Sequence, residues 1–438
     1  MPRGAGGASL SGQKTFPRPD AAKCSTLTLG ASTASLVCSQ KGNAMARAAL
    51  SILNFAAAVL CASWAGLAIP PAPPAHTSLD FTRRVISVGK GPGFIVIADV
   101  NRDGIPDLLV ANEDDATVSV LLGDGKGQFV AAPLSPFPCN SNPNDIAVAD
   151  MNGDGNPDLV IANHQTPYIT ILLGDGKGAF TSAPHSPFAT ESYPHPHGVA
   201  VGDFRGDGKP AVVTDSWGDG KILLIPSDGR GSLILPGKFF PSDTHTDQGV
   251  RSADFNKDGH PDIVSNGEKS NGVSLMLGDG HGGFHKAPGS PFAAGADPWA
   301  FTIDDINRDG NPDVLVIPYH RDLSDLKQLG VTVLLGDGKG GFSTMRGSPL
   351  SLAGCDGPDR IAAGDLTGDG RRDIVVSCAL NNKLFFFLAA KDGSFTTSSH
   401  SVPTGWGGLA VGRLDAGGRD AIVVSNHDSA SITVLLGK

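Results

Sequence analysis

The chain has 438 residues, of which 40% are hydrophobic and 18% charged, and it contains 58 glycines and 32 prolines. This composition is typical of many short strands joined by tight turns and disfavours a helical bundle. The formal net charge of −10, with no local cluster of Lys and Arg, disfavours nucleic acid and anionic lipid as partners and suits divalent cations.

The N-terminal part carries a predicted export signal. Residues 1–44 are rich in Gly, Ser and Ala, and form either a disordered leader or an untranslated stretch before a true start at Met45. Residues 45–68 combine Arg47, an apolar run and small residues before a cleavage point, as in a signal peptide. The apolar run is shorter than the ~20 residues of a membrane span. We therefore expect a mature chain without a membrane span, secreted to the periplasm, cell surface or medium; an uncleaved anchor and lipidation at Cys61 are alternatives.

After a Pro-rich linker at 69–78, the rest of the chain is repetitive. Seven related segments begin at residues 99, 150, 203, 254, 305, 365 and 413. Each unit contains four short strand patterns, and one such sheet cannot bury both of its faces alone. Packing the sheets around an axis solves this problem. The prediction for residues 79–438 is an all-β, seven-bladed β-propeller of four-stranded antiparallel blades, in which Leu79–Val88 supplies the last strand of blade seven.

An acidic loop follows the first strand of most units. In the first copy, oxygen-bearing side chains stand at loop positions 1, 3, 5 and 9, and Gly104 stands at position 6. Alternate residues of a tight loop point inward, and Gly allows the positive φ that the turn needs. Hard cations such as Ca²⁺ prefer six to eight oxygen ligands. The pattern therefore indicates calcium loops, with ordinary turn chemistry as the alternative.

These loops, together with turns such as LGDGKGGF, resemble the FG-GAP or VCBS repeats of integrin α-chain-type propellers and many secreted bacterial proteins. The resemblance implies a seven-bladed fold with about five structural Ca²⁺ ions, and it implies no single activity. A backbone carbonyl at position 7 should add to each shell. The implied ligands are Asp99, Asn101, Asp103 and Asp107; Asp150, Asn152, Asp154 and Asp158; Asp254, Asn256, Asp258 and Asp262; Asp305, Asn307, Asp309 and Asp313; and Asp365, Thr367, Asp369 and Asp373.

Two blades depart from the pattern. Blade three has Arg205 at position 3 and Ala211 at position 9, and blade seven has Arg413 at position 1 and Gly417 at position 5. A guanidinium in the loop would replace the charge of the metal. We predict no Ca²⁺ in either blade.

The end of the propeller opposite the acidic loops is the predicted recognition surface. There, residues that differ between the repeats combine aromatic rings with amides and charges, which suits a sugar or a protein partner; packing within loops is the alternative. The candidate ligand-binding residues are Asn144, Asp145, His197, Trp217, Gln248, Trp299, Tyr319, His320, Asp359, Arg360 and Trp406.

Two further features map to this end. The pair His195 and His197 specifies a transition metal poorly, because two histidines without a third ligand are common. Cys355 and Cys378 can form a disulfide in an oxidising compartment, which would leave Cys139 unpaired.

Three functions fit this sequence. The first is a secreted, monomeric, calcium-binding propeller that acts as an extracellular binding or adhesion module for a glycan or protein. The alternatives are a propeller-type hydrolase or polysaccharide lyase, and a passive cell-surface scaffold. No Ser/His/Asp or Cys/His arrangement is recognisable, and the acid pair Asp145 and Asp359 rests on repeat alignment alone. We therefore expect no enzymatic activity.

Overall fold

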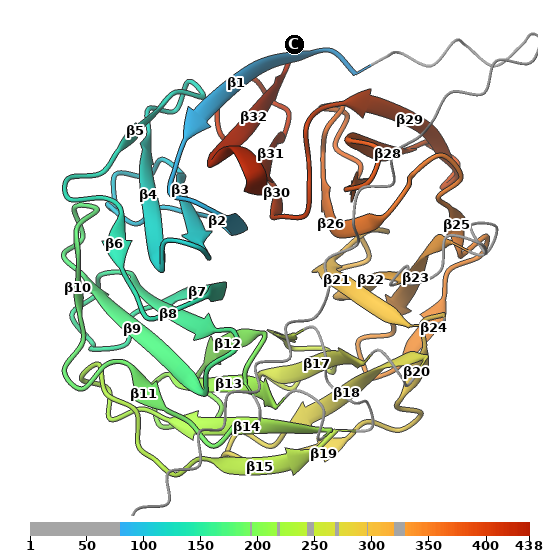
Figure 1. Cartoon of the computed structure of the whole chain (residues 1–438). Coiled ribbons are helices and arrows are strands. Elements are labelled where there is room, and N and C mark those ends of the chain that lie inside the picture. The colour runs from blue at the N-terminus through green and yellow to red at the C-terminus, as the bar shows by residue number, and fades with distance from the viewer. Residues whose placement is uncertain are drawn as a thin grey trace, which may run out of the picture. The chain divides into compact units, whose positions relative to one another are not determined.

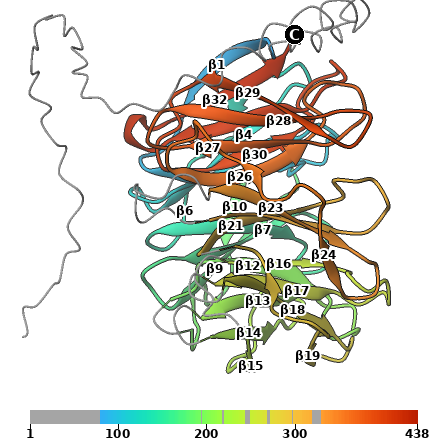
Figure 2. The ribbon, with the colours of Figure 1, turned by 90° about the vertical axis from the view of Figure 1, so that its right-hand side faces the viewer.

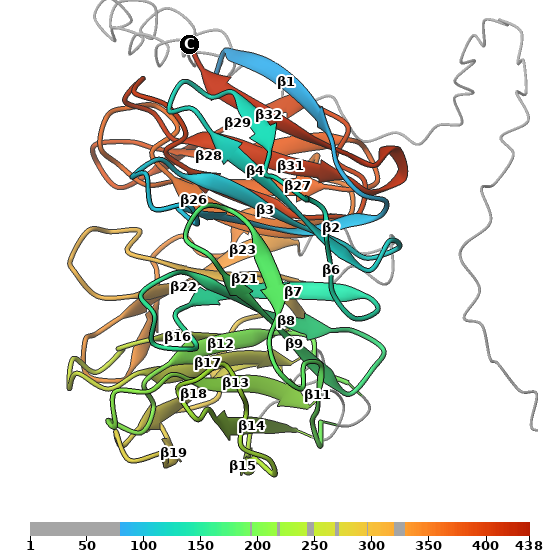
Figure 3. The ribbon, with the colours of Figure 1, turned by 90° about the vertical axis from the view of Figure 1, so that its left-hand side faces the viewer.

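The computed structural model describes residues 79–438, apart from 193–194, 217–219, 243–248, 268–270, 296 and 319–328. The expected leader, signal peptide and Pro-rich linker lie outside the described residues. The described chain forms seven antiparallel sheets arranged in a ring (Figure 1). Seen from the two sides, neighbouring blades pack face to face as tilted sheets (Figure 2 and Figure 3). The predicted seven-bladed β-propeller is confirmed.

The strands run from the centre of the ring outward in each blade. Blades one to three contain β2 (Pro92–Ala98), β3 (Asp107–Asn112), β4 (Thr117–Gly123), β5 (Phe129–Ala131) and β6 (Phe137–Pro138); β7 (Pro143–Ala149), β8 (Asp158–Asn163), β9 (Tyr168–Gly174), β10 (Phe180–Ser182) and β11 (Phe188–Ala189); and β12 (Val199–Gly202), β13 (Ala211–Ser216), β14 (Lys221–Pro226) and β15 (Lys238–Pro241).

Blades four to seven contain β16 (Val250–Ala253), β17 (Asp262–Gly267), β18 (Gly272–Gly278), β19 (Phe284–Lys286) and β20 (Phe292–Ala293); β21 (Pro298–Asp304), β22 (Asp313–Pro318), β23 (Gly330–Gly336), β24 (Phe342–Thr344) and β25 (Leu350–Ser351); β26 (Pro358–Gly364), β27 (Asp373–Cys378), β28 (Lys383–Ala389) and β29 (Phe395–Ser401); and β30 (Leu409–Gly412), β31 (Ala421–Asn426), the 3₁₀ turn η2 (His427–Ser429), β32 (Ser431–Gly437) and the N-terminal β1 (Phe81–Ser87). No helix among the described residues has the length and apolar character needed to cross a bilayer.

The ring closes as predicted. Strand β1 pairs antiparallel with β32 along its whole length, from Phe81 opposite Gly437 to Ser87 opposite Ser431. The ring of Phe81 also lies 6.1 Å from that of Phe386 in blade six. The first strand of the propeller therefore supplies the outer strand of the last blade, which joins the two ends of the repeat array.

The hydrophobic core lies between the blades. Every residue of β3, β8, β13, β17, β27 and β31 is buried, because each blade packs against a neighbour on both faces. Leu109 of β3, for example, belongs to one apolar cluster with Ile146 and Leu159 of blade two. Burial on both faces explains why these strands are nearly continuous apolar runs rather than alternating ones.

The outer strand differs from the single fourth strand that the sequence predicts. In four blades it is split into two short pieces that pair with opposite ends of the same third strand. A Ser-Pro segment lies beside each break, and proline has no N–H to donate to a sheet. The serine hydroxyl instead accepts the N–H of the third strand at 2.9–3.0 Å: Ser135 from Val120, Ser186 from Ile171, Ser290 from Leu275 and Ser348 from Val333.

Candidate metal loops and the opposite end of the channel

The acidic loop of blade two shows how these loops fold. Asp150, directly after β7, accepts hydrogen bonds from the N–H groups of Asp154 (3.2 Å) and Gly155 (2.8 Å). The amide oxygen of Asn152 accepts a second bond from the Asp154 N–H at 2.9 Å. Gly155 has φ +82°, the left-handed conformation expected at position 6. The chain therefore wraps around its own acidic side chains.

The carboxylate at position 9 connects this loop to the rest of the blade. Asp158 is fully buried and accepts N–H groups of Met151 (2.7 Å) and Gly174 (2.8 Å) through its two oxygens. Burial raises the pKa of Asp158 to about 6, and the negative charges of Asp154 and Asp150 raise it further despite the two backbone bonds. Repulsion among these carboxylates is the situation that a bound cation would relieve.

The same arrangement recurs in the other complete loops. Burial raises the pKa of Asp262, Asp313 and Asp373 to about 6, and it raises the pKa of Asp107 as well. The side chains at positions 1, 3, 5 and 9 of these loops are aspartates, asparagines and one threonine, so each offers an oxygen. This donor chemistry fits a hard cation such as Ca²⁺.

Blade six has a complete loop with an added feature. The hydroxyl of Thr367 at position 3 is buried without a hydrogen-bond partner, as a ligand oxygen for a cation would be. Asp369 at position 5, however, forms an ion pair with Arg371 at position 7. The residues of blade six fit Ca²⁺, but a guanidinium competes for one of its carboxylates.

Blade three folds the same loop with an internal cation. Asp203 keeps the bond from the Gly208 N–H at 2.8 Å. Arg205 places Nη2 2.7 Å from the Asp207 carboxylate, and Ala211 contributes no side-chain oxygen at position 9. The guanidinium therefore neutralises the carboxylate at position 5 that the complete loops could offer to a metal.

Blade seven lacks the complete set of ligand side chains, and its loop is bonded to blade six instead. Arg413 Nε lies 3.5 Å from the Asp420 carboxylate, which also accepts the N–H of Asp365 at 2.8 Å. Arg372 of blade six lies 3.5 Å from the same carboxylate. Asp420 is thus held by cations of the chain itself.

The acidic loops also join neighbouring blades, a role that sequence reasoning missed. The third glycine of a GDGKG-type turn donates its N–H to the carbonyl at loop position 2 of the preceding blade, as Gly231 does to Met151 (3.0 Å) and Gly282 to Phe204 (2.9 Å). The side chains at position 2 are buried in all seven repeats: Val100, Met151, Phe204, Phe255, Ile306, Leu366 and Leu414. Their uniformly apolar character is the signal that could have revealed this contact.

A channel runs along the centre of the propeller, with a volume of about 570 Å³. Four of the predicted ligand-binding residues line it: Asn144, Asp145, His197 and Arg360. Arg251 and Arg372 line it as well, and neither was predicted. Four other predicted residues, Trp217, Gln248, Tyr319 and His320, lie outside the described residues.

Asp145 and Asp359 connect blades at this channel. Each is almost fully buried and accepts a backbone N–H of the following blade at 3.0 Å. Asp145 also pairs with Arg251 Nη1 at 2.7 Å, and Asp359 with Arg360 Nη1 at 2.9 Å. Burial raises the pKa of Asp145, although Arg251 opposes this shift. Their carboxylates are already engaged by groups of the protein.

The tryptophans differ in what they offer a ligand. Trp299 is half-buried, with Nε1 3.5 Å from the Asp359 carboxylate, and its carbonyl accepts Asn266 Nδ2 at 2.7 Å. Trp406 is 46% exposed. Trp406 is therefore the described tryptophan best placed to meet a ligand.

Glu113, a residue that sequence reasoning missed, adds a carboxyl to this end. It follows β3 at the repeat position that His164 and His427 occupy in blades two and seven. Burial raises the pKa of Glu113, while His427 and Arg360 oppose this shift. Aligning the loops after each second strand would have brought it into the candidate set.

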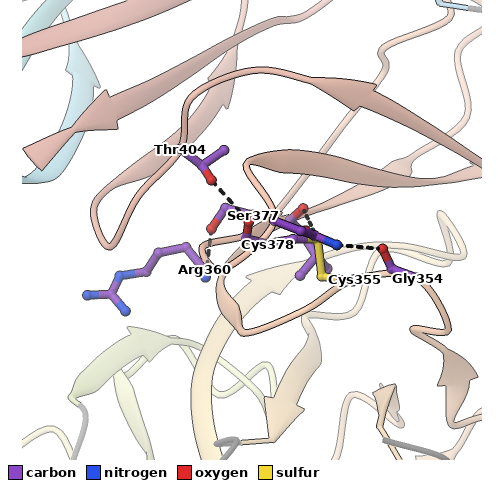
Figure 4. The surroundings of a disulfide bond; sticks show 8 residues. Gly354, Cys355, Arg360, Ser377, Cys378 and Thr404 are labelled. Carbon is purple, nitrogen blue, oxygen red and sulfur yellow. Dashed lines mark hydrogen bonds between the residues drawn. A yellow bond between two sulfur atoms is a disulfide. The ribbon is translucent and has the colours of Figure 1, made fainter. Parts of the chain in front are cut away.

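Cys355 and Cys378 form a disulfide behind this surface (Figure 4). It joins the link between blades five and six to the end of β27, whose last carbonyl accepts the Thr404 hydroxyl at 3.2 Å. Arg360, from the start of β26, extends away from the disulfide (Figure 4). Cys139 is a buried free thiol whose pKa burial raises to about 12.

Comparison with known proteins identifies the repeats. The model of the FG-GAP-like repeat matches residues 99–161, 150–214 and 254–316, which confirms the resemblance seen in the sequence. A protein of Plasmodium yoelii yoelii, named a T-cell immunomodulatory protein homolog, is 28% identical over 165 residues. That match covers 30% of this chain and only 23% of the relative.

Solved structures share the fold at low identity. The crystal structure of BBS1N in complex with ARL6DN gives a TM-score of 0.53 at 13% identity, covering 82% of this chain and 96% of the other. A functionally unknown protein from Desulfotomaculum acetoxidans gives a TM-score of 0.50 at 14% identity, covering 72% and 91%. At such identities the likeness establishes the propeller architecture alone.

Proposed function

Taking a β-propeller built of FG-GAP-like repeats as the premise, we propose that this chain is an exported, calcium-stabilised binding module. It recognises a glycan or an extracellular protein through the end of the channel opposite the acidic loops. The observation that carries this proposal is the separation of two ends: repeated acidic loops at one, and residues that vary from blade to blade at the other.

The acidic loops support a structural role for calcium. Their carboxylates are crowded, and the loops contact the neighbouring blade through position 2. At extracellular Ca²⁺ near the typical Kd of such modules, 10⁻⁴–10⁻³ M, each site adds from a few tenths to about 1 kcal/mol. Occupied loops would hold adjacent blades together, and the opposite end would keep its shape.

At the opposite end, the two predicted acids Asp145 and Asp359 support binding rather than catalysis. A general acid needs a protonated carboxyl free to meet the substrate. Asp145 and Asp359 instead hold arginines and backbone N–H groups. The half-exposed ring of Trp406 and the guanidinium of Arg360 offer stacking and hydrogen bonding, which suit a sugar or a protein side chain.

The disulfide supports export. Disulfides persist mainly in oxidising compartments outside the cytosol. The Cys355–Cys378 bond and the predicted signal peptide at residues 45–68 point to the same destination. We propose the periplasm, cell surface or medium as the location.

A glycan array probed with the mature chain, in Ca²⁺ and in EGTA, tests the proposal. We expect binding to a defined set of glycans that weakens in EGTA, because loss of calcium loosens the blades. Trp406→Ala should reduce that binding about two- to tenfold, since a stacked aromatic contact is worth roughly 0.5–1.5 kcal/mol. The matched control, Val130→Ala on the exposed outer strand β5, should bind like the wild type.

Two results would separate the forms of this proposal. No glycan binding in either buffer would exclude the glycan form and leave a protein partner, to be tested on a panel of purified extracellular proteins. Cleavage of an arrayed glycan, seen as product by mass spectrometry, would contradict the binding module in favour of a hydrolase or lyase.

A further inference from the structure

Three histidines from two separate segments meet beside the channel. His164 lies in the turn between β8 and β9, and His195 and His197 lie in the link that leads to β12. Strands β8 and β12 are neighbours (Figure 1). The ring centroids are 4.5 Å (164–195), 4.6 Å (164–197) and 4.8 Å (195–197) apart. The fold thus supplies the third histidine that the sequence pair lacked.

The distances suit a metal. One nitrogen from each ring lies within 4.8 Å of the others, and no other such group occurs among the described residues. Two nitrogens bound to one tetrahedral Zn²⁺ at about 2.0–2.1 Å are roughly 3.3 Å apart. Small side-chain rotations that move each ring nitrogen by about 1 Å would therefore bring the three nitrogens around one ion.

A buried carboxylate lies beside one of these rings. Asp215 in β13 is fully buried, and its Oδ1 accepts the N–H groups of His197 (2.9 Å) and Gly198 (2.6 Å). Its Oδ2 lies 3.5 Å from His197 Nδ1. A small approach of this carboxylate to Nδ1 would fix the ring and direct Nε2 toward a metal, as is typical of histidine ligands. This contact is a feature of metal sites that ring packing alone does not require.

The backbone of the two segments is held in place. The His164 N–H donates to the carbonyl of Asn142 at 2.8 Å. The carbonyl of His197 accepts Asn144 Nδ2 at 2.8 Å. Pro196 restricts the chain between the other two histidines. The segments that carry His164 and His197 are therefore anchored by hydrogen bonds to their backbone.

We propose that His164, His195 and His197 form a three-histidine site for Zn²⁺, whose remaining coordination position opens toward the central channel. His197 lines that channel, so a water or an oxygen of a bound ligand can take the open position. Ca²⁺ does not compete, because it prefers oxygen ligands. This site is independent of the acidic loops and lies at the proposed recognition end.

Metal titration of the mature chain tests the site. The protein is freed of transition metals, returned to saturating Ca²⁺ and titrated with Zn²⁺ by calorimetry, with Co²⁺ as a spectroscopic substitute. We expect one Zn²⁺ per chain and a visible Co²⁺ spectrum of tetrahedral type. Absence of both would overturn the proposal and leave three imidazoles packed against each other.

Variants locate the site. His164→Ala and His195→Ala should each weaken Zn²⁺ binding by more than the roughly 10–100-fold typical of outer-shell changes. Asp215→Asn keeps an oxygen for the two backbone N–H groups and should weaken binding by about 10–100-fold. The matched control is His285→Ala on the exposed strand β19, which should leave the affinity unchanged.

Two outcomes of the variant series would contradict the assignment. Equal Zn²⁺ affinity in His164→Ala and His285→Ala would place the ion elsewhere, for example in an acidic loop. An unchanged Co²⁺ spectrum in Asp215→Asn and His195→Ala together would do the same. Circular dichroism in Ca²⁺ identifies any variant that is not folded. If the variants do not fold, the Co²⁺ spectrum of the wild-type protein decides whether the tetrahedral site exists.

Discussion

Blades two and three carry the same loop with different chemistry. In blade two, Asp150 and Asp158 accept hydrogen bonds from backbone N–H groups, and Asn152 accepts the N–H of Asp154. In blade three, Asp203 holds the corresponding backbone N–H, although Arg205 and Ala211 replace two of the ligands. The two loops therefore share the first aspartate, the aspartate at position 5 and the glycine at position 6. Ligand capacity depends on the positions that blade three has changed.

Removal of all calcium should change the stability of the protein more than any single substitution in these loops. If about five complete loops are occupied, their summed stabilisation is roughly 2–5 kcal/mol near the Kd of each site. Calorimetry in Ca²⁺ and in EGTA should therefore record a lower melting temperature in EGTA. An unchanged melting temperature would contradict occupied loops.

Asp158→Ala should make blade two resemble blade three. The change leaves the N–H groups of Met151 and Gly174 buried without their acceptor, at a cost of about 1–3 kcal/mol each. We expect a loss of about 3 kcal/mol of unfolding free energy in denaturant titration, and one Ca²⁺ fewer by equilibrium dialysis. The exposed change Asp175→Ala in the adjacent turn is the control and should keep the calcium count.

The double variant Arg205→Asn/Ala211→Asp should make blade three resemble blade two. It restores oxygens at positions 3 and 9 beside Asp203 and Asp207 and removes the competing guanidinium. We expect one additional Ca²⁺ per chain and a gain of a few tenths to about 1 kcal/mol in saturating Ca²⁺. Arg205→Asn alone should add no ion, because position 9 still lacks a carboxylate.

Lys257→Gly in blade four should have the smallest effect. Position 4 has φ +60° there, whereas blade two has Gly153 at φ +78°. Glycine removes the strain of the left-handed conformation but also gains freedom in the unfolded chain, so a net stabilisation of about 0.5 kcal/mol remains. Thermal unfolding in Ca²⁺ measures this gain, and a loss of stability would mean that the lysine side chain contributes more than the strain costs.

Much of the fold could be predicted because each repeat is a local pattern. The acidic loops, the glycines at left-handed positions and the closing strand β1 depend on neighbouring residues and on the order of the units. The split of the outer strand was missed, although each Ser-Pro pair is visible in the sequence. Recognising it requires knowing that the serine hydroxyl lies opposite a third-strand N–H, as Ser135 does opposite Val120.

The sequence by itself determined the number of blades, the face of the acidic loops and the loops that lack ligands, because periodic residues carry that information. Only the tertiary structure decided which distant residues meet at the opposite end. Asp145 pairs with Arg251 across 106 positions, and His164 joins His195 and His197 from another segment. These contacts depend on how the blades pack around the channel, and the spacing of residues along the chain does not encode that packing.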